Sequence, residues 1–236
     1  GLSATVSGLS AGTTYYYRVR AVRPGFTSPS STTMTGLTLP SAPTVPNATG
    51  VTFSTFTANW IASPGATSYL LDVSTNSNFT SFVSGYQNLP VSTGVTKLVT
   101  GLSGGTTHYF RVRAANASGN SSYSATAFLT TISGAPVATA ATQAQDFQFT
   151  ANWNAVSSAT EYRLDVWPSA GSSASPLFNY NDLAVSGTTK IVYGLSGGTS
   201  YTYRVRAVNA GGTSINSNEI TVLTLPAKPA VADATN

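Results

Sequence analysis

The chain has 236 residues, of which 41% are hydrophobic and only 8% are charged, so it is apolar enough to fold around a core. It contains no cysteine, which excludes disulfide frameworks and thiolate metal sites. Eleven Lys and Arg against seven Asp and Glu give a net charge of +4, but the basic residues do not cluster, so no nucleic-acid partner is expected.

One sequence pattern recurs three times along the chain. It begins at Gly8, Gly101 and Gly194, a spacing of 93 residues, and reads GLSAGTTYYYRVRAVR, GLSGGTTHYFRVRAAN and GLSGGTSYTYRVRAVN. A 93-residue unit has the size of a small independent domain and exceeds a solenoid repeat. The phase of the pattern predicts the C-terminal part of a truncated domain at 1–38, complete domains at 39–131 and 132–224, and the start of a further domain at 225–236.

Alternating apolar and polar side chains predict strands in each complete unit. Residues 56–60 read FTANW, which places Phe56, Ala58 and Trp60 on one face of a half-buried strand, and the same letters return at 149–153. No segment shows a sustained helical stripe. The pattern therefore predicts an antiparallel β-sandwich.

Two longer strands follow in each unit. Residues 69–73 read YLLDV, with Tyr69, Leu71 and Val73 predicted to face the core. The longest strand is predicted to place His108, Phe110, Val112 and Ala114 inside and Tyr109, Arg111 and Arg113 outside.

The units are joined by short segments that contain proline. They read LTLPSAP at 37–43, LTTISGAP at 129–136 and LTLPAKP at 223–229. Proline restricts backbone freedom, so we expect short, fairly stiff joints and an extended array.

These residues resemble a known family. Trp60 and Trp153 on an early strand, the strands of Tyr69 and Tyr162, and the motif G-L-x-x-G-T-x-[YH]-x-x-x-V-x-A are similar to the fibronectin type III domain. The amino-acid sequence of these segments resembles the fibronectin type III repeats of large secreted or surface-attached bacterial proteins. The resemblance implies an all-β chain of tandem seven-stranded antiparallel β-sandwiches, fibronectin type III and immunoglobulin-like, in an extended array.

The resemblance also implies that the strand of Tyr69 lies beside the longest strand in one sheet. Outward ion pairs of about 0.2–1 kcal/mol are then expected between Asp72 and Arg111 or Arg113, and between Asp165 and Arg204 or Arg206. The alternative is that these arginine rows face an acidic polysaccharide or a neighbouring chain.

The family also has a tyrosine corner, in which a tyrosine hydroxyl bonds a nearby backbone group. The resemblance places this corner at Tyr15, at Tyr201 and, in the middle unit, at His108. An imidazole can donate to a carbonyl but reaches less far than a phenol. We therefore expect a slightly less stable corner in the middle unit.

Two patterns were tested for chemistry. His108 is the single histidine, and its repeat equivalents are tyrosines, so a structural role is favoured over a catalytic or metal-binding one. Glu161 and Asp165 lie four residues apart on a strand, which separates them by about 13 Å, whereas glycosidase pairs need about 5–9.5 Å. We expect no enzyme activity and no catalytic, cofactor-binding or metal-binding residue, and we assign no binding residue.

Exposed aromatic side chains are the remaining binding candidates. Tyr16 and Tyr109 are predicted to point outward, Trp167 follows a strand, and Phe26 lies in a loop. They are not repeated, because Thr202 replaces Tyr109 and Ser74 replaces Trp167 in the sister units. A repeated binding site built on them is therefore not expected.

The sequence predicts a non-catalytic structural or adhesive segment of a longer extracellular or cell-surface bacterial protein, a stiff stalk or fibre of repeated domains. The expected partners are proteins, including further copies through open sheet edges, and polysaccharide; no cofactor and no membrane insertion are expected. The alternative is a spacer or a set of carbohydrate-contacting accessory modules in a secreted carbohydrate-active enzyme.

Overall fold

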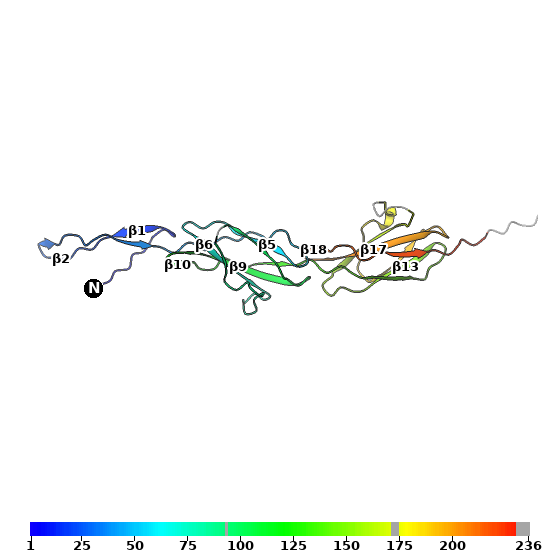
Figure 1. Cartoon of the computed structure of the whole chain (residues 1–236), viewed down its shortest axis with the longest axis horizontal. Helices are drawn as coiled ribbons and strands as arrows, with labels where there is room; N and C mark the ends of the chain where they lie inside the picture. Colours follow the sequence, from blue (N-terminus) through cyan, green and yellow to red (C-terminus); the bar gives the residue numbers. More distant parts are fainter. Residues whose placement is uncertain (93, 171–174, 230–236) are drawn as a thin grey trace, which may run out of the picture. The chain divides into compact units, whose positions relative to one another are not determined.

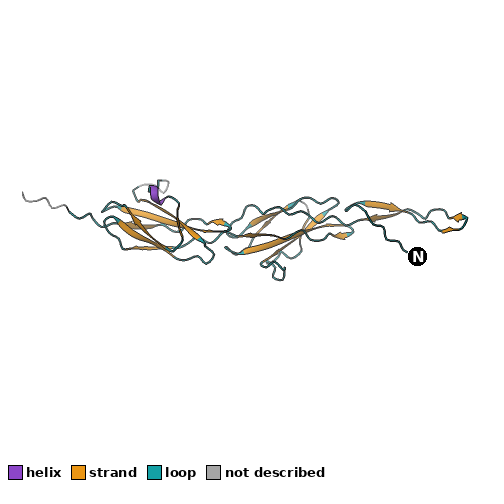
Figure 2. Ribbon diagram, turned by 180° about the vertical axis from the view of Figure 1, so that it is seen from behind, coloured by secondary structure: helices purple, strands orange, loops and turns teal. Residues whose placement is uncertain are grey.

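The computed structural model describes residues 1–92, 94–170 and 175–229. It divides into unit 1, residues 1–50, 56–100 and 107–129, and unit 2, residues 51–55, 101–106 and 130–236. Strands dominate both units, and the described residues contain one helix, the short 3-10 turn η1, Phe178–Tyr180 (Figure 2). Residues 230–236 of the predicted further domain lie outside the described residues. We call residues 39–131 the middle repeat and 132–224 the last repeat.

Unit 1 begins with a long hairpin (Figure 1). Its strands are β1 (Thr14–Tyr17), β2 (Val22–Arg23), β3 (Phe26–Thr27) and β4 (Met34–Leu37). β1 pairs antiparallel with β4, and β2 with β3. Tyr17 and Val19 are 52% and 66% exposed, although their counterparts Phe110 and Val112 in the middle repeat are fully buried. The alternating pattern alone therefore does not bury this hairpin.

The middle repeat contributes two sheets. Its strands are β5 (Phe56–Asn59), β6 (Ser68–Ser74), β7 (Leu89–Val91), β8 (Thr96–Val99), β9 (Thr107–Asn116), β10 (Gly119–Asn120) and β11 (Ala127–Thr130). The larger sheet has the order β7-β6-β9, and both β10 and β11 pair with β9. β5 and β8 form the smaller sheet, which an isolated bridge between Thr49 and Thr57 extends.

The last repeat has the same order with a fuller first strand. Its strands are β12 (Ala138–Thr142), β13 (Gln148–Trp153), β14 (Glu161–Pro168), β15 (Leu183–Val185), β16 (Thr189–Tyr193), β17 (Ser200–Asn209), β18 (Gly212–Thr213) and β19 (Ile220–Leu223). The sheets are β12-β13-β16 and β15-β14-β17, and β17 also pairs with β18 and β19. Counting β18 and β19 as one interrupted strand, the described part of this repeat is a seven-stranded antiparallel sandwich, as predicted.

The cores lie between the two sheets of each repeat. Phe56 and Phe110 are fully buried, and their ring centroids are 5.3 Å apart across the middle repeat. Phe149 and Tyr203 take the same places in the last repeat at 5.8 Å. Burying each large apolar side chain stabilises the fold by about 1.5–3 kcal/mol. The predicted inward faces of the strands and the β-sandwich fold are confirmed.

A serine-rich segment follows the outer edge of β9 and of β17. In the last repeat, the Ser217 N–H donates to the Val205 carbonyl at 2.8 Å, and the Ser217 Oγ accepts the Val205 N–H at 2.9 Å. Ser214 makes the same two bonds with Ala207. Ser121 and Ser124 repeat this arrangement in the middle repeat. Serine side chains here replace the carbonyl groups of a regular strand, which explains why the seventh strand is interrupted.

Candidate functional site

The outer face of the larger sheet in the middle repeat carries a predicted ion pair. β6 and β9 place Asp72 opposite Arg111, and the Arg111 Nε donates to Asp72 Oδ2 at 3.0 Å. The Asn88 N–H also donates to this carboxylate at 2.7 Å. The predicted pairing is confirmed. Asp72 is however only 1% exposed, so the expectation of a weak surface pair was wrong: segments beyond the strands cover this face.

Two aromatic rings enclose the arginine of this pair. The Arg111 guanidinium carbon lies 3.9 Å from the centroid of the Phe79 ring and 3.6 Å from that of Tyr123. A guanidinium placed over ring faces is attracted by their negative electrostatic potential. Arg111 is therefore committed to contacts inside its own repeat, which disfavours the alternative of an arginine row facing an external polyanion.

The corresponding carboxylate in the last repeat has more partners. Asp165 accepts the Arg204 Nε at 3.2 Å, an Arg206 Nη2 hydrogen bond at 3.1 Å and the Asp182 N–H at 2.8 Å. Arg206 also contacts Asp182 Oδ1 at 2.9 Å. Asp165 is 3% exposed, so its charge is balanced by guanidinium and amide groups rather than by water.

The four aromatic candidates from the sequence have different environments. Tyr16 and Phe26 are 72% and 66% exposed, as expected for outward positions. Tyr109 is half-buried against Phe128, with ring centroids 6.1 Å apart. Trp167 is only 4% exposed, so its use as an exposed binding residue was wrong. It is the penultimate residue of β14, in a run of consecutive buried residues, and the Arg204 guanidinium carbon lies 5.3 Å from its ring centroid.

The acidic pair tested for hydrolysis is divided between separate partners. Arg163 Nη2 contacts Glu161 Oε1 at 2.6 Å, whereas Asp165 is held by Arg204 and Arg206. Within the described residues, no three His, Asp or Glu side chains gather in a way that could hold a metal ion. The same residues include no helix with the length and apolar character needed to span a bilayer.

At the tyrosine corners the hydroxyl accepts a backbone N–H, whereas the sequence reasoning considered an imidazole that donates to a carbonyl. The Tyr15 hydroxyl accepts the Ser10 N–H at 2.8 Å, and the Tyr201 hydroxyl accepts the Ser196 N–H at 3.0 Å. A substitute at this place must therefore offer an acceptor to match the bond, rather than donate to a carbonyl. His108, at the equivalent position of the middle repeat, is 1% exposed.

A side-chain contact ties the joint at residues 37–43 within unit 1. The Asn116 Nδ2, at the end of β9, donates to the Thr38 carbonyl at 2.9 Å, and the Asn116 Oδ1 accepts the Ser118 N–H at 2.9 Å. The Ser118 hydroxyl donates to the Leu37 carbonyl at 2.6 Å. Gly12 faces Pro64 so closely that a Cβ would lie 2.2 Å from the Pro64 oxygen. Asn116 and Ser118 thus hold the backbone where one repeat follows another, and the glycine at position 12 permits the close approach to Pro64.

Unit 2 contains the same contact at the joint of residues 129–136. The Asn209 Nδ2, at the end of β17, donates to the Thr131 carbonyl at 3.0 Å, and its Oδ1 accepts the Gly211 N–H at 2.9 Å. Gly211 replaces Ser118, and a Cβ on it would lie 2.3 Å from the Thr130 oxygen. The asparagine is shared by both joints, whereas the glycine in place of Ser118 belongs to the second joint alone.

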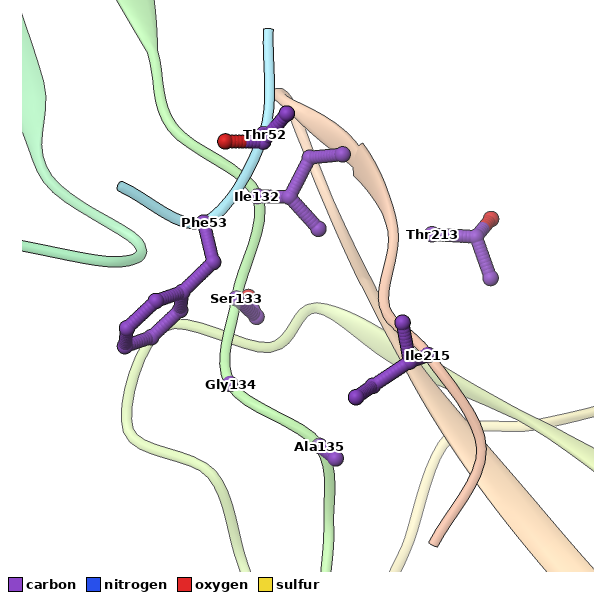
Figure 3. Close-up of a pocket in the computed structure, with 8 residues that line it drawn as sticks. All are labelled: Thr52, Phe53, Ile132, Ser133, Gly134, Ala135, Thr213 and Ile215. Carbon is purple, nitrogen blue, oxygen red and sulfur yellow. The ribbon is translucent and has the colours of Figure 1, made fainter. Parts of the chain in front are cut away.

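An apolar hollow of about 490 Å³ lies beside this second joint, within unit 2. Figure 3 shows it between the β18 segment with Thr213 and Ile215 and the chain from Ile132 to Ala135. Phe53 belongs to the same lining and is 52% exposed, and Ile215 is 82% exposed. The hollow is lined in part by residues of the joint, and no charged side chain lines it.

A second, smaller hollow of about 220 Å³ combines aromatic residues that the sequence reasoning missed. Phe178 and Tyr193 line it and are 96% and 62% exposed. The 93-residue comparison pairs Phe178 with Gly85. Allowing one extra residue in the loop before β15 pairs it with Ser84, and this aromatic replacement is the signal that could have revealed the surface.

The comparison with protein families agrees with this geometry. The fibronectin type III domain model matches residues 134–223, and the middle repeat has the same strand pairing 93 residues earlier. Residues 134–223 thus match a fibronectin type III domain, and the resemblance to tandem domains of this family that the sequence predicted is confirmed.

Relatives of these fibronectin type III domains include two bacterial proteins with enzyme names. Chitinase A1 of Niallia circulans is 31% identical over 193 residues, covering 79% of this chain and 26% of the relative. Exoglucanase B of Cellulomonas fimi is 30% identical over 249 aligned positions, covering 94% of this chain and 21% of the relative. Fibronectin type III domain-containing protein 7 of Mus musculus is 28% identical, covering 82% and 24%. The chain spans about a quarter of the length of these relatives.

Solved structures of the family also align with the chain. The FN1–FN3 domains of chicken CNTN1 align with a TM-score of 0.42 and 18% identity, covering 92% of this chain and 79% of that one. The two fibronectin type III domain segment from chicken tenascin aligns with a TM-score of 0.43 and 19% identity, covering 78% and 99%.

Proposed function

We propose that this chain is a non-catalytic spacer segment of a longer extracellular protein, with fibronectin type III domains that follow one another through joints of similar geometry. The observation that carries the proposal is the repeated asparagine contact, Asn116 to Thr38 and Asn209 to Thr131. A contact that recurs at the same place in successive joints restricts the hinge in the same way each time. Restricted hinges suit a spacer because they limit how far neighbouring domains can fold back.

Two roles for such a spacer follow from the sequence, a stalk or adhesive fibre and an accessory segment of a carbohydrate-active enzyme. The names chitinase and exoglucanase among the relatives support the accessory role. They also support an extracellular location, since insoluble polysaccharides are degraded outside the cell. Self-association remains a prediction of the sequence, and the serine-lined edges of β9 and β17 disfavour it along those edges.

Small-angle X-ray scattering of the full chain tests the spacer. We expect the wild-type profile to fit a narrow set of arrangements and an N116A/N209A double variant to require a broader ensemble, because each joint loses a hydrogen bond of about 1 kcal/mol. N154A is the matched control, since Asn154 is exposed in the last repeat and outside both joint contacts. Identical profiles for the wild type and the double variant would contradict the proposal.

The accessory role is tested in the precursor. Deleting residues 39–224 is expected to lower activity on an insoluble polysaccharide while activity on soluble oligosaccharides stays unchanged, because only the insoluble substrate makes domain spacing matter. A precursor that has no catalytic domain would instead favour the stalk. The scattering test of the joints does not depend on which of these two results is obtained.

A further inference from the structure

The last repeat exposes two aromatic rings that line one hollow. Phe178, in η1, is 96% exposed, and Tyr193, at the end of β16, is 62% exposed. Both line the hollow of about 220 Å³, together with Leu177, Asn179, Tyr180 and Gly194. Exposed aromatic rings that share a hollow are poorly explained by packing, because burying them would stabilise the fold more.

A buried tyrosine fixes the position of this aromatic surface. Tyr180 is 4% exposed, and its hydroxyl accepts the Tyr193 N–H at 2.9 Å. The two rings meet edge to face, with centroids 6.2 Å apart and planes at 85°. Tyr193 therefore keeps its exposed position without a ligand, and binding would cost little ordering entropy.

The residues that line the hollow carry no charge, and polar side chains lie on the strands beside it. β13 places Gln148 opposite Tyr193 and Thr150 opposite Ile191 on the same sheet. Asn179 adds an exposed amide at the hollow. Amides and hydroxyls around aromatic faces match a ligand that has both C–H faces and hydroxyl groups and no charge.

We propose that Phe178 and Tyr193 form a stacking platform for a neutral polysaccharide. One face of a pyranose ring carries mainly C–H groups and packs against an aromatic face, while the ring hydroxyls reach the neighbouring amides and hydroxyls. The occupant is a sugar chain rather than a second copy of this protein, because a stable protein interface buries about 800 Å² per partner. Six residues around a small hollow offer far less.

The middle repeat supplies a matched comparison inside the same chain. Asn88 and Asp182 make the same backbone bond to the sheet carboxylate, which sets a 94-residue offset in this loop and aligns Tyr86 with Tyr180. The Tyr86 hydroxyl accepts the Thr100 N–H at 2.8 Å, just as Tyr180 accepts that of Tyr193. The supporting tyrosine is thus present in both repeats. Ser84 and Thr100 replace Phe178 and Tyr193, so the middle repeat has the support without the platform.

Co-sedimentation of the full chain with microcrystalline cellulose and with chitin tests the platform. The F178S/Y193T double variant, which takes the middle repeat's residues, is expected to bind at least one of these polysaccharides about tenfold more weakly than the wild type, because two stacking contacts are lost. I215S, at an exposed apolar residue of the other hollow, is the control and should bind as the wild type does. Both replaced residues are exposed, so unchanged thermal unfolding is expected of the double variant.

Three results would overturn the platform: no wild-type binding to either polysaccharide, equal binding by wild type and double variant, or a dimer that light scattering finds only in the wild type. The last would identify the surface as a protein interface. The platform goes beyond the spacer function, and the readouts are separate. Weaker polysaccharide binding by F178S/Y193T with an unchanged scattering profile is evidence about the platform alone. A changed scattering profile of N116A/N209A is evidence about the spacer alone.

Discussion

The middle and last repeats are two versions of one domain, and they differ mainly outside the strands. Both bury a carboxylate, Asp72 or Asp165, on the outer face of the larger sheet. In the middle repeat one arginine pairs with it and two aromatic rings cover that arginine; in the last repeat two arginines and a second acid, Asp182, take part. The shared residues thus define the sandwich, and the loop residues decide how its buried charge is balanced.

The largest expected difference between the repeats concerns the buried carboxylates. Asp165→Ala leaves Arg204 and Arg206 without their shared counter-charge and the Asp182 N–H without its acceptor, so we expect a loss of about 3 kcal/mol. Asp72→Ala removes one arginine bond and one amide bond and should cost less, about 2 kcal/mol. Calorimetry of the full chain, with the two repeats unfolding separately, measures both. A larger loss for Asp72→Ala would reverse the ranking of the two networks.

The next difference appears at alkaline pH. Tyr203 replaces the middle repeat's Phe110 in the core, and burial raises the pKa of its phenol, although the Asn152 N–H bond acts in the lowering direction. Below a pH of about 10 the phenol is neutral in both states and pH has no effect through it. Above that pH the unfolded chain ionises first, so the last repeat should lose stability as pH rises towards the raised pKa.

Tyr203→Phe should reduce this alkaline loss while costing about 1 kcal/mol at neutral pH, since the hydroxyl also bonds the Thr139 carbonyl. Tyr180, whose pKa burial also raises, should retain an alkaline effect in this variant. Urea unfolding at pH 8 and pH 11 gives the comparison. An equal alkaline loss in Tyr203→Phe and the wild type would exclude Tyr203 as its source.

The smallest expected difference is at the tyrosine corner. Tyr201→His gives the last repeat the middle repeat's residue and should cost about 1 kcal/mol, because the Ser196 N–H loses a well-placed acceptor. His108→Tyr should stabilise the middle repeat by a similar or smaller amount. Thermal unfolding of each variant measures the change in stability. If both exchanges changed the stability in the same direction, the residue at the corner would not explain a difference between the repeats.

Much of the fold was predictable from alternation and repetition. Phe56, Ala58 and Trp60 were placed in the core by their spacing alone, and the Asp72–Arg111 pair by the expected neighbourhood of two strands. Trp167 was placed wrongly because a two-residue period assumes that the outer face is open. In both repeats, the loop that follows this strand folds back onto the strand itself. The Val83 N–H donates to the Val73 carbonyl of β6, and the Leu177 N–H donates to the Val166 carbonyl of β14.

The candidate surfaces were less predictable. The joint contact depends on an asparagine side chain that reaches a carbonyl 78 residues away in the chain, a distance that no local pattern encodes. The platform of Phe178 and Tyr193 was not predicted because the loop before β15 is one residue longer in the last repeat. A comparison at a fixed spacing of 93 residues therefore aligns the wrong positions in that loop. Comparing repeats after local alignment, rather than at a fixed spacing, would have exposed it.

The serine-lined edge has a consequence for how such a chain reaches its folded state. Neighbouring domains of similar sequence are prone to exchange strands, because each edge can accept its neighbour's strand as readily as its own. At β9 and β17 the N–H groups of Val112 and Val205 are matched by hydroxyls, which a strand from another domain cannot supply through its backbone. The edge thus selects a segment that carries serines at these positions, which disfavours pairing with strands that lack them. Because both repeats carry the same serines, this selection acts against unrelated strands and does not distinguish one repeat from the other.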